Sequence, residues 1–344
     1  MEKLLALANL ERLLARFARE GTVWAPARDP KGDVALVLWR PEKPVTLDYR
    51  NFLQSPKSFL LPQNQTLLRF TQGKSEEPSL PEGATILFGV RPCDSRALLV
   101  LDRVFLNGDS PSAVSGSDHR DPYYARLRER TTVVALACTR TMPSCFCSSV
   151  GGGPGQAMGA DVLAVDLDTD ILLRPQTDRG QRLLESVAEI LSEASNEAIK
   201  ESQERITNAE GQLVRVKTDD SARRLRNSFD SPLWEAGGMK CLGCGTCSFL
   251  CPTCHCFDIA DEVREGVGSR IRTWDCCAYP LFTLQGSGHN PRPTARERWR
   301  QRIMHKFRYA VESCGTSFCV GCGRCIRSCP VSLDLRTTLR EVGE

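Results

Sequence analysis

Two cysteine motifs near the C-terminal end of the sequence share one spacing. "CLGCGTCSFLCP" begins at residue 241 and "CVGCGRCIRSCP" begins at residue 319, and both follow the pattern C-x-G-C-G-x-C-x-x-x-C-P. In this spacing, three cysteines of a motif surround one cubane cluster, and the fourth, followed by Pro, binds the cluster of the other motif. The pattern predicts two [4Fe–4S] clusters, one bound by Cys241, Cys244, Cys247 and Cys329, the other by Cys319, Cys322, Cys325 and Cys251.

Zinc is the alternative occupant, because two C-x2-C pairs satisfy a tetrahedral zinc ion. Zinc does not require four cysteines in this spacing, followed by Pro, twice. The glycines at 243, 245, 321 and 323 permit positive φ angles and let backbone N–H groups approach the cluster sulfides. The sequence therefore favours iron and sulfide over zinc.

Four further cysteines precede these motifs, and two of them follow expected strands. Cys93 comes after the apolar run 84–90, and Cys138 lies at the end of the run 131–139. Sites in open α/β sheets form at the carboxyl ends of strands, so we expect these thiols to meet. Cys145 and Cys147 lie on the loop that follows. These four residues form a candidate third [4Fe–4S] site, with Asp94 as a candidate substitute ligand; the alternative is that they are small buried apolar side chains.

The composition is that of a soluble chain of two domains. The 344 residues carry a net charge of +3 and 17 cysteines, and this charge does not by itself imply a nucleic-acid partner. No apolar run approaches the roughly 20 residues that span a bilayer. The first 20 residues lack the features of a signal peptide, so we expect a cytoplasmic protein whose clustered cysteines bind metal. Their apolar positions predict an amphipathic helix instead, with Leu4, Leu7, Leu10, Leu14 and Phe17 on one face.

The order of the expected elements indicates an α+β chain, with an α/β domain first and a helical dicluster ferredoxin-like domain last. Strands are expected at 33–39, 84–90, 131–139 and 161–168, with a loop at 55–82 and a long helix from 181 to 206. Asp94 or Ser95 is expected to cap a helix that begins near Arg96. The expected units are an α/β domain at 1–180, a helical connector at 181–235 and the ferredoxin-like domain at 236–344.

The spacer between the two motifs contains a basic segment at 293–312, which predicts a helix. Its side chains include Arg296, Arg298, Arg300, Arg302, Lys306 and Arg308. A solvated helix face is one interpretation, and docking to an acidic partner or compensation of anionic clusters is another. Nucleic-acid binding is a weaker third, because no groove-reading module is present.

Several segments of the sequence resemble a family of iron–sulfur subunits. They are "FGVRPCDSRAL" (88–98), "CFCSSVGGGPG" (145–155), "FDSPLWE" (229–235), "CPTCHCFDI" (251–259), "RTWDCC" (272–277), "HNPRP" (289–293) and "HKFRY" (305–309). They are similar to the β subunit of cytoplasmic sulfhydrogenases and to the corresponding iron–sulfur subunit of anaerobic sulfite reductase, over about residues 85 to 344. Homologous subunits also occur beside heterodisulfide reductase-type modules.

The resemblance implies an electron-transfer subunit without acid–base catalysis of its own. Its expected partners are a flavin subunit that handles NAD(P)H and a catalytic subunit of hydrogenase, sulfite reductase or heterodisulfide reductase type. No G-x-G-x-x-G follows a strand, which agrees with a flavin held elsewhere. A redox-sensing regulatory protein, or a catalytic reductase of sulfur compounds, remains an alternative.

The other cysteines receive no metal role at this stage. They are Cys254, Cys256, Cys276, Cys277 and Cys314. Because the first three match positions of the resembled family, one of them could replace a ligand in the third set. His255 and His289 could bind metal, but a hydrogen bond to a cluster sulfide is an equal alternative.

Overall fold

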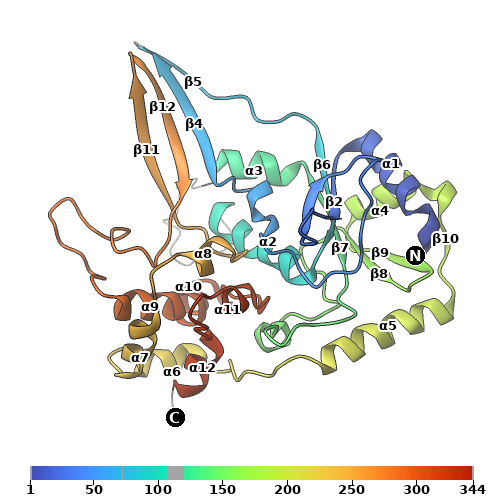
Figure 1. Cartoon of the computed structure of the whole chain (residues 1–344). Helices are drawn as coiled ribbons and strands as arrows, with labels where there is room; N and C mark the ends of the chain where they lie inside the picture. Colours follow the sequence, from blue (N-terminus) through green and yellow to red (C-terminus); the bar gives the residue numbers. More distant parts are fainter. Residues whose placement is uncertain (1, 72, 107–119, 343–344) are drawn as a thin grey trace.

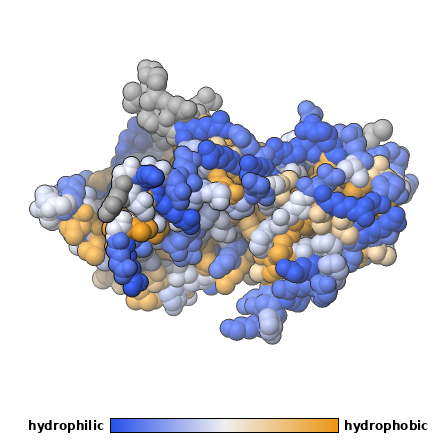
Figure 2. Space-filling model, turned by 90° about the horizontal axis from the view of Figure 1, so that it is seen from above, coloured by the Kyte–Doolittle hydropathy of each residue, from blue (hydrophilic) through white to orange (hydrophobic). Residues whose placement is uncertain are grey.

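The computed structural model of the chain describes residues 2–71, 73–106 and 120–342 and has a mixed α+β architecture. A large sheet and a small sheet are joined by helices, and the C-terminal helices gather beside the small sheet (Figure 1). Within the described ranges, no helix has both the length and the apolar character needed to cross a membrane. From above, the surface is mostly hydrophilic, with hydrophobic residues in separate patches (Figure 2).

The large sheet has the strand order β10-β1-β9-β8-β7-β6-β2-β3, with parallel pairing between β2, β6, β7 and β8. β6 and β7 are nearly or fully buried, as expected for strands covered on both faces. The four expected strands are present. The strands are β1 (Lys3–Ala6), β2 (Gly21–Arg28), β3 (Val34–Leu38), β6 (Ala84–Val90), β7 (Thr131–Leu136), β8 (Val162–Asp166), β9 (Asp170–Pro175) and β10 (Ser192–Glu193).

The small sheet is antiparallel, in the order β11-β12-β4-β5, and forms a projecting arm (Figure 1). Its strands are β4 (Asn64–Thr71), β5 (Lys74–Glu76), β11 (Phe257–Arg264) and β12 (Val267–Trp274). The prediction of a loop at 55–82 is therefore wrong. The polar composition of that segment hides a strand because its partner, β12, lies some 200 residues later in the chain.

The expected helix at the N-terminus is only partly present. Lys3–Ala6 forms β1, which pairs with β9 and β10, and α1 covers Leu10–Glu20. Leu10, Leu14 and Phe17 are buried as expected, whereas Leu4 belongs to the strand. Sheet hydrogen bonds with distant strands outweigh the local helical spacing.

The predicted long helix at 181–206 is broken. α4 (Asp178–Glu185) ends before β10, and α5 (Asn196–Gly211) begins after Ser195, whose side chain accepts a hydrogen bond from the Ala198 N–H. Pairing of β10 with β1 interrupts the helix. The expectation that α2 begins near Arg96 is also wrong: α2 (Pro92–Phe105) begins with Pro at its first position, where the missing N–H costs nothing.

The remaining helices are α3 (Pro122–Glu129), which packs on the core of the large sheet through Tyr124, and the helices around the C-terminal motifs. The latter are α6 (Ser221–Asn227), α7 (Leu233–Lys240), α8 (Thr246–Phe249), α9 (Ala295–Met304), η5 (His305–Tyr309), α10 (Ala310–Cys314), α11 (Arg324–Arg327) and α12 (Leu335–Glu341). α9, the π-helical turn η5 and α10 are continuous and confirm the expected basic helix. α7 packs closely on α9 because it carries glycines at 237 and 238.

Candidate iron–sulfur cluster sites

The predicted ligands of the first C-terminal cluster line one cavity, here called the C-terminal cavity. It has about 620 Å³ of space, part of which is open to solvent, and Cys241, Cys244, Cys247 and Cys329 all line it. Gly243 and Gly245 have φ angles of 67° and 75°, which a side chain would strain. Leu242 and Cys244 are exposed, so this cavity lies close to the surface.

The four predicted ligands of the second C-terminal cluster also lie together. Cys251, Cys319 and Cys322 are buried, each less than a tenth exposed. Burial raises the pKa of Cys325, and the thiols of Cys251, Cys322 and Cys319 add to that rise. Cys325 also lines the C-terminal cavity, so the two ligand sets adjoin one another.

The candidate ligands of the third cluster line the N-terminal cavity, of about 400 Å³. Cys93, Cys138, Cys145 and Cys147 are all part of its wall. The parallel pairing of β6 with β7 places Cys93 and Cys138 at the same edge of the sheet, as the sequence predicts. The loop that carries Cys145 and Cys147 folds back so that Pro154 O accepts a hydrogen bond from the Cys138 N–H at 2.9 Å.

Burial controls the protonation of these thiols. It raises the pKa of Cys147 to about 12 and that of Cys319 to about 11. Both thiols are therefore protonated in the metal-free chain at neutral pH. Since iron binds thiolates, loading of either set releases protons.

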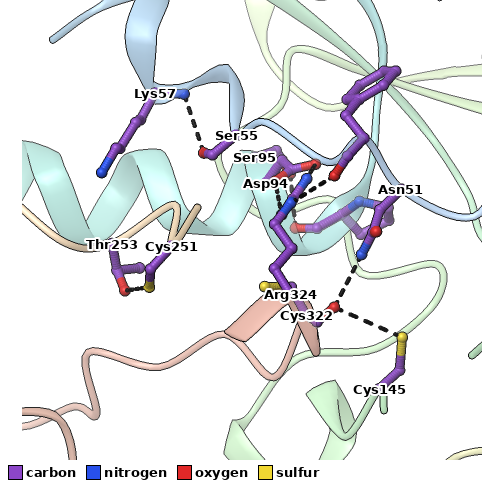
Figure 3. A network of polar contacts seen from close by, with 12 residues as sticks. Asn51, Ser55, Lys57, Asp94, Ser95, Cys145, Cys251, Thr253, Cys322 and Arg324 are labelled. Carbon is purple, nitrogen blue, oxygen red and sulfur yellow. Dashed lines mark hydrogen bonds and ion pairs between the residues drawn. The ribbon is translucent and has the colours of Figure 1, made fainter. Parts of the chain in front are cut away.

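The N-terminal cavity and the second ligand set meet directly. The Phe146 N–H donates to Gly321 O at 2.9 Å, and the Cys145 thiol lies 3.9 Å from Cys322 O (Figure 3). Gly321 and Cys322 line the N-terminal cavity as well. The contact is close enough that a Cβ atom on Gly321 would lie 2.5 Å from the Cys147 nitrogen.

A buried ion pair fastens this junction. Arg324 donates to the two Asp94 carboxylate oxygens at 2.6 and 3.0 Å, and both side chains are fully buried (Figure 3). Its Nε also donates to Phe52 O at 2.8 Å. Arg324 engages both carboxylate oxygens and Asp94 does not line the N-terminal cavity, so the structure gives no support to Asp94 as a metal ligand.

Two polar residues without a role assigned from the sequence, Arg91 and Asn51, also line the N-terminal cavity. Arg91 donates to Ala137 O at 2.8 Å and stacks on the Tyr49 ring, 4.0 Å from its centroid. Asn51 donates to Cys322 O at 2.9 Å (Figure 3). Arg91 directly precedes Pro92 and Cys93, a position that hinted at its role, whereas nothing in the sequence singles out Asn51.

The basic helix places two cations beside the motif thiols rather than in solvent. Lys306 Nζ lies 3.4 Å from the Cys251 thiol, and Arg302 Nη2 donates to Cys247 O at 2.8 Å. Although burial opposes it, the proximity of Cys251 raises the pKa of Lys306. These contacts favour charge compensation over a fully solvated helix face.

The cysteines without an assigned role fall into three groups. Cys254, Cys256 and Cys277 line a separate cavity of about 310 Å³, to which His255 and His305 also contribute. We call it the histidine-lined cavity. Cys276 is fully buried, with its sulfur near Gly245 O. Cys314 touches Ser313 and lines none of the three cavities.

None of these cysteines lines the N-terminal cavity. His289 lies in an exposed turn. Within residues 2–71, 73–106 and 120–342, no group of three or more His, Cys, Asp or Glu side chains is arranged to hold a single metal ion.

Comparison with known proteins agrees with this arrangement of cysteines. Residues 240–333 match the family model of the 4Fe-4S dicluster domain. The chain is also 32% identical over 306 residues to sulfhydrogenase 2 subunit beta of Pyrococcus furiosus. The aligned region covers 87% of this chain and 86% of that protein. The matched domain contains all eight motif cysteines and the cysteines of the histidine-lined cavity.

Proposed function

Because the chain belongs to the sulfhydrogenase β-subunit family and is an iron–sulfur electron-transfer subunit, we propose that it relays single electrons through three [4Fe–4S] clusters. The proposed ligands are the three sets of four cysteines described above. The observation that carries the proposal is the contact between successive sets. Cys145 adjoins Cys322, and Cys325 of the same set lines the C-terminal cavity.

The residues around the thiols fit such clusters. Positively charged Arg91, Arg302 and Lys306 offset the negative charge that four thiolates bring to each centre. Glycines with positive φ at 243, 245, 321 and 323 present backbone amides to the ligand loops. The clusters, once bound, supply one-electron chemistry; the protein supplies thiolates, hydrogen bonds and burial, which together set the potentials.

The surface beside the C-terminal cavity suits contact with another subunit. Met239 is 83% exposed and Leu242 is 68% exposed, and Leu242 lines the cavity itself. Exposed apolar side chains beside a redox centre are typical of a docking surface. We assign this end of the relay to a partner subunit.

The finer assignments extend the family membership. The proposed partners are a flavin subunit that handles NAD(P)H and a catalytic subunit of hydrogenase, sulfite reductase or heterodisulfide reductase type. The proposed units are an α/β domain at 1–180, a helical connector at 181–235 and a helical ferredoxin-like domain at 236–344. A cytoplasmic location suits this many free thiols.

Iron analysis of anaerobically purified protein tests the third cluster. We expect Cys145→Ser to lower the iron content by about four atoms per chain, whereas Cys314→Ser leaves it unchanged. Far-UV circular dichroism of both variants checks the fold. An equal iron content in the two variants would refute a cluster in the N-terminal cavity.

Purification of the native complex tests the relay. We expect the chain to elute with a flavin subunit, and NAD(P)H to bleach its visible absorbance when that subunit is present. Leu242→Asp should weaken the association, whereas Val263→Asp, on the projecting arm and 64% exposed, should not. The proposal would be contradicted if the chain eluted alone and if NAD(P)H failed to reduce its clusters even in the complete cell extract.

A further inference from the structure

Three cysteines that belong to none of the three relay sites line the histidine-lined cavity. Cys254 and Cys256 follow the first motif, and Cys277 follows β12. The β11–β12 hairpin closes on itself through the pairing of Phe257 with Trp274, so the two ends of the hairpin lie side by side. This pairing brings Cys256 and Cys277 together across a gap of some 20 residues in sequence.

The hairpin base is fixed on both sides. The Asp275 N–H donates to Cys256 O at 2.9 Å, and Trp274 Nε1 donates to Leu61 O at 3.1 Å. Lys57 Nζ, 3.9 Å from the Trp274 ring centroid, donates to Cys254 O at 2.9 Å. Contacts of the protein itself therefore hold the backbone on which these thiols lie.

The charges around this cavity call for an anionic occupant. Lys57, Arg302 and Lys306 are each at most 5% exposed. In the described part of the chain, none of the three has a carboxylate within 4.0 Å. A buried cation without an anionic partner is costly, so thiolates are the groups that balance these charges.

Cys251 and Cys254 have matching surroundings. Lys306 Nζ lies 3.4 Å from the Cys251 thiol, and Arg302 Nη1 lies 3.7 Å from the Cys254 thiol. Cys251 belongs to a motif proposed to bind a cluster, so the matching position of a cation beside the Cys254 sulfur favours Cys254 as a further ligand.

A nitrogen donor completes the wall. His255 Nδ1 lies 3.1 Å from Thr253 O, so that nitrogen carries the proton and donates, which leaves Nε2 with a free lone pair. Histidines that bind a metal through one ring nitrogen commonly donate the other N–H to a backbone carbonyl in this way.

We propose that the histidine-lined cavity binds a further iron–sulfur cluster through Cys254, Cys256 and Cys277, with His255 as the fourth ligand. The occupant is a polynuclear cluster rather than a single ion, like the occupants of the two C-terminal motifs. The site goes beyond the three-cluster relay, and it adjoins the relay at Cys251. A histidine ligand gives such a centre a higher potential than four cysteines do.

Iron analysis with matched variants tests the site. In anaerobically purified full-length protein, we expect the double variant Cys254→Ser with Cys256→Ser to lose about four iron atoms per chain relative to Cys314→Ser. The electron paramagnetic resonance signals of the relay clusters should persist in the double variant. Equal iron content in both variants, or zinc lost in place of iron, would overturn the proposal.

A second variant separates a structural role from ligation. His255→Gln should keep the overall fold by circular dichroism but alter the resonance signal and lower the midpoint potential of one centre. If the relay signals persist while the double variant loses no iron, only this site fails and the relay stands. If thiol titration finds a Cys256–Cys277 disulfide in native protein, the site holds no cluster.

Discussion

The ion pair between Asp94 and Arg324 yields a quantitative test of how the two cluster-bearing parts are joined. Asp94→Asn keeps the shape of the side chain and removes its negative charge. Arg324 then remains charged and fully buried, since a guanidinium does not lose its proton in proteins. Removal of one partner from such a buried pair destabilises a protein by about 3–5 kcal/mol.

The expected effect on unfolding follows from this free energy. About 3 kcal/mol corresponds to a factor of roughly 100 in an equilibrium constant, part of which appears in the unfolding rate. Because proteins with tightly bound cofactors depart from two-state behaviour, the rate is the better measure. We expect Asp94→Asn to lose the visible cluster absorbance about 10- to 100-fold faster at a fixed urea concentration under anaerobic conditions.

The projecting arm supplies a matched control. Arg270 donates to both oxygens of Asp261 at 2.8 Å, so this pair is also bidentate but lies in solvent. Asp261→Asn should therefore unfold like the unaltered protein. Asp94→Asn combined with Arg324→Met removes both charges and should recover part of the loss, although Phe52 O then lacks its donor. If Asp94→Asn unfolds no faster than Asp261→Asn, the reasoning is wrong.

Two further predictions concern the ligand loops. Gly321→Ala adds a Cβ atom 2.5 Å from the Cys147 nitrogen and should lower the iron content. Gly315→Ala is the control, because Gly315 has a similar φ of 68° but no neighbour within 4 Å of the added Cβ atom, and it should keep its iron. Equal iron content in the two variants would contradict the role of this contact. Lys306→Met removes a cation beside Cys251 and so destabilises the reduced, more negative cluster. Its midpoint should fall by on the order of 50–100 mV in a redox titration followed by paramagnetic resonance, and an unchanged midpoint would exclude the charge as a determinant.

Local spacing was enough to predict which cysteines lie together, although their assignment as cluster ligands stays a proposal. The C-terminal motifs place their ligands within 12 consecutive residues each, and the N-terminal set follows from two buried strands whose carboxyl ends lie at one edge of the sheet. The resemblance to known subunits was equally informative, and the sequence comparison confirms it. Where chemistry depends on residues close in sequence or on adjacent parallel strands, the pattern and the structure agree.

Contacts between distant residues were beyond the reach of the sequence. The partner of β4 is β12, and the partner of Asp94 is Arg324, which is 230 residues away. Such pairs leave no local pattern, so the segment 55–82 was predicted as a loop and Asp94 as a ligand. The histidine-lined cavity was missed for the same reason, because only the hairpin brings Cys277 to Cys256.

The basic segment at 293–312 has the composition of a solvated helix, yet part of it lies in the protein interior. Arg302 and Lys306 occupy positions four apart on continuous helix, so they share one face and point into the sulfur-rich interior. Arg296 pairs with Glu235 and Arg308 with Glu312 at partly exposed positions, where ordinary ion pairs suffice. On this helix, the buried cations therefore lie beside sulfur atoms, and the partly exposed arginines pair with carboxylates. Among the residues that the structure describes, Arg302 and Lys306 are buried without a carboxylate partner, so sulfur is the group that can carry the compensating negative charge. Buried cations beside thiols are therefore a physical reason to look for iron–sulfur clusters.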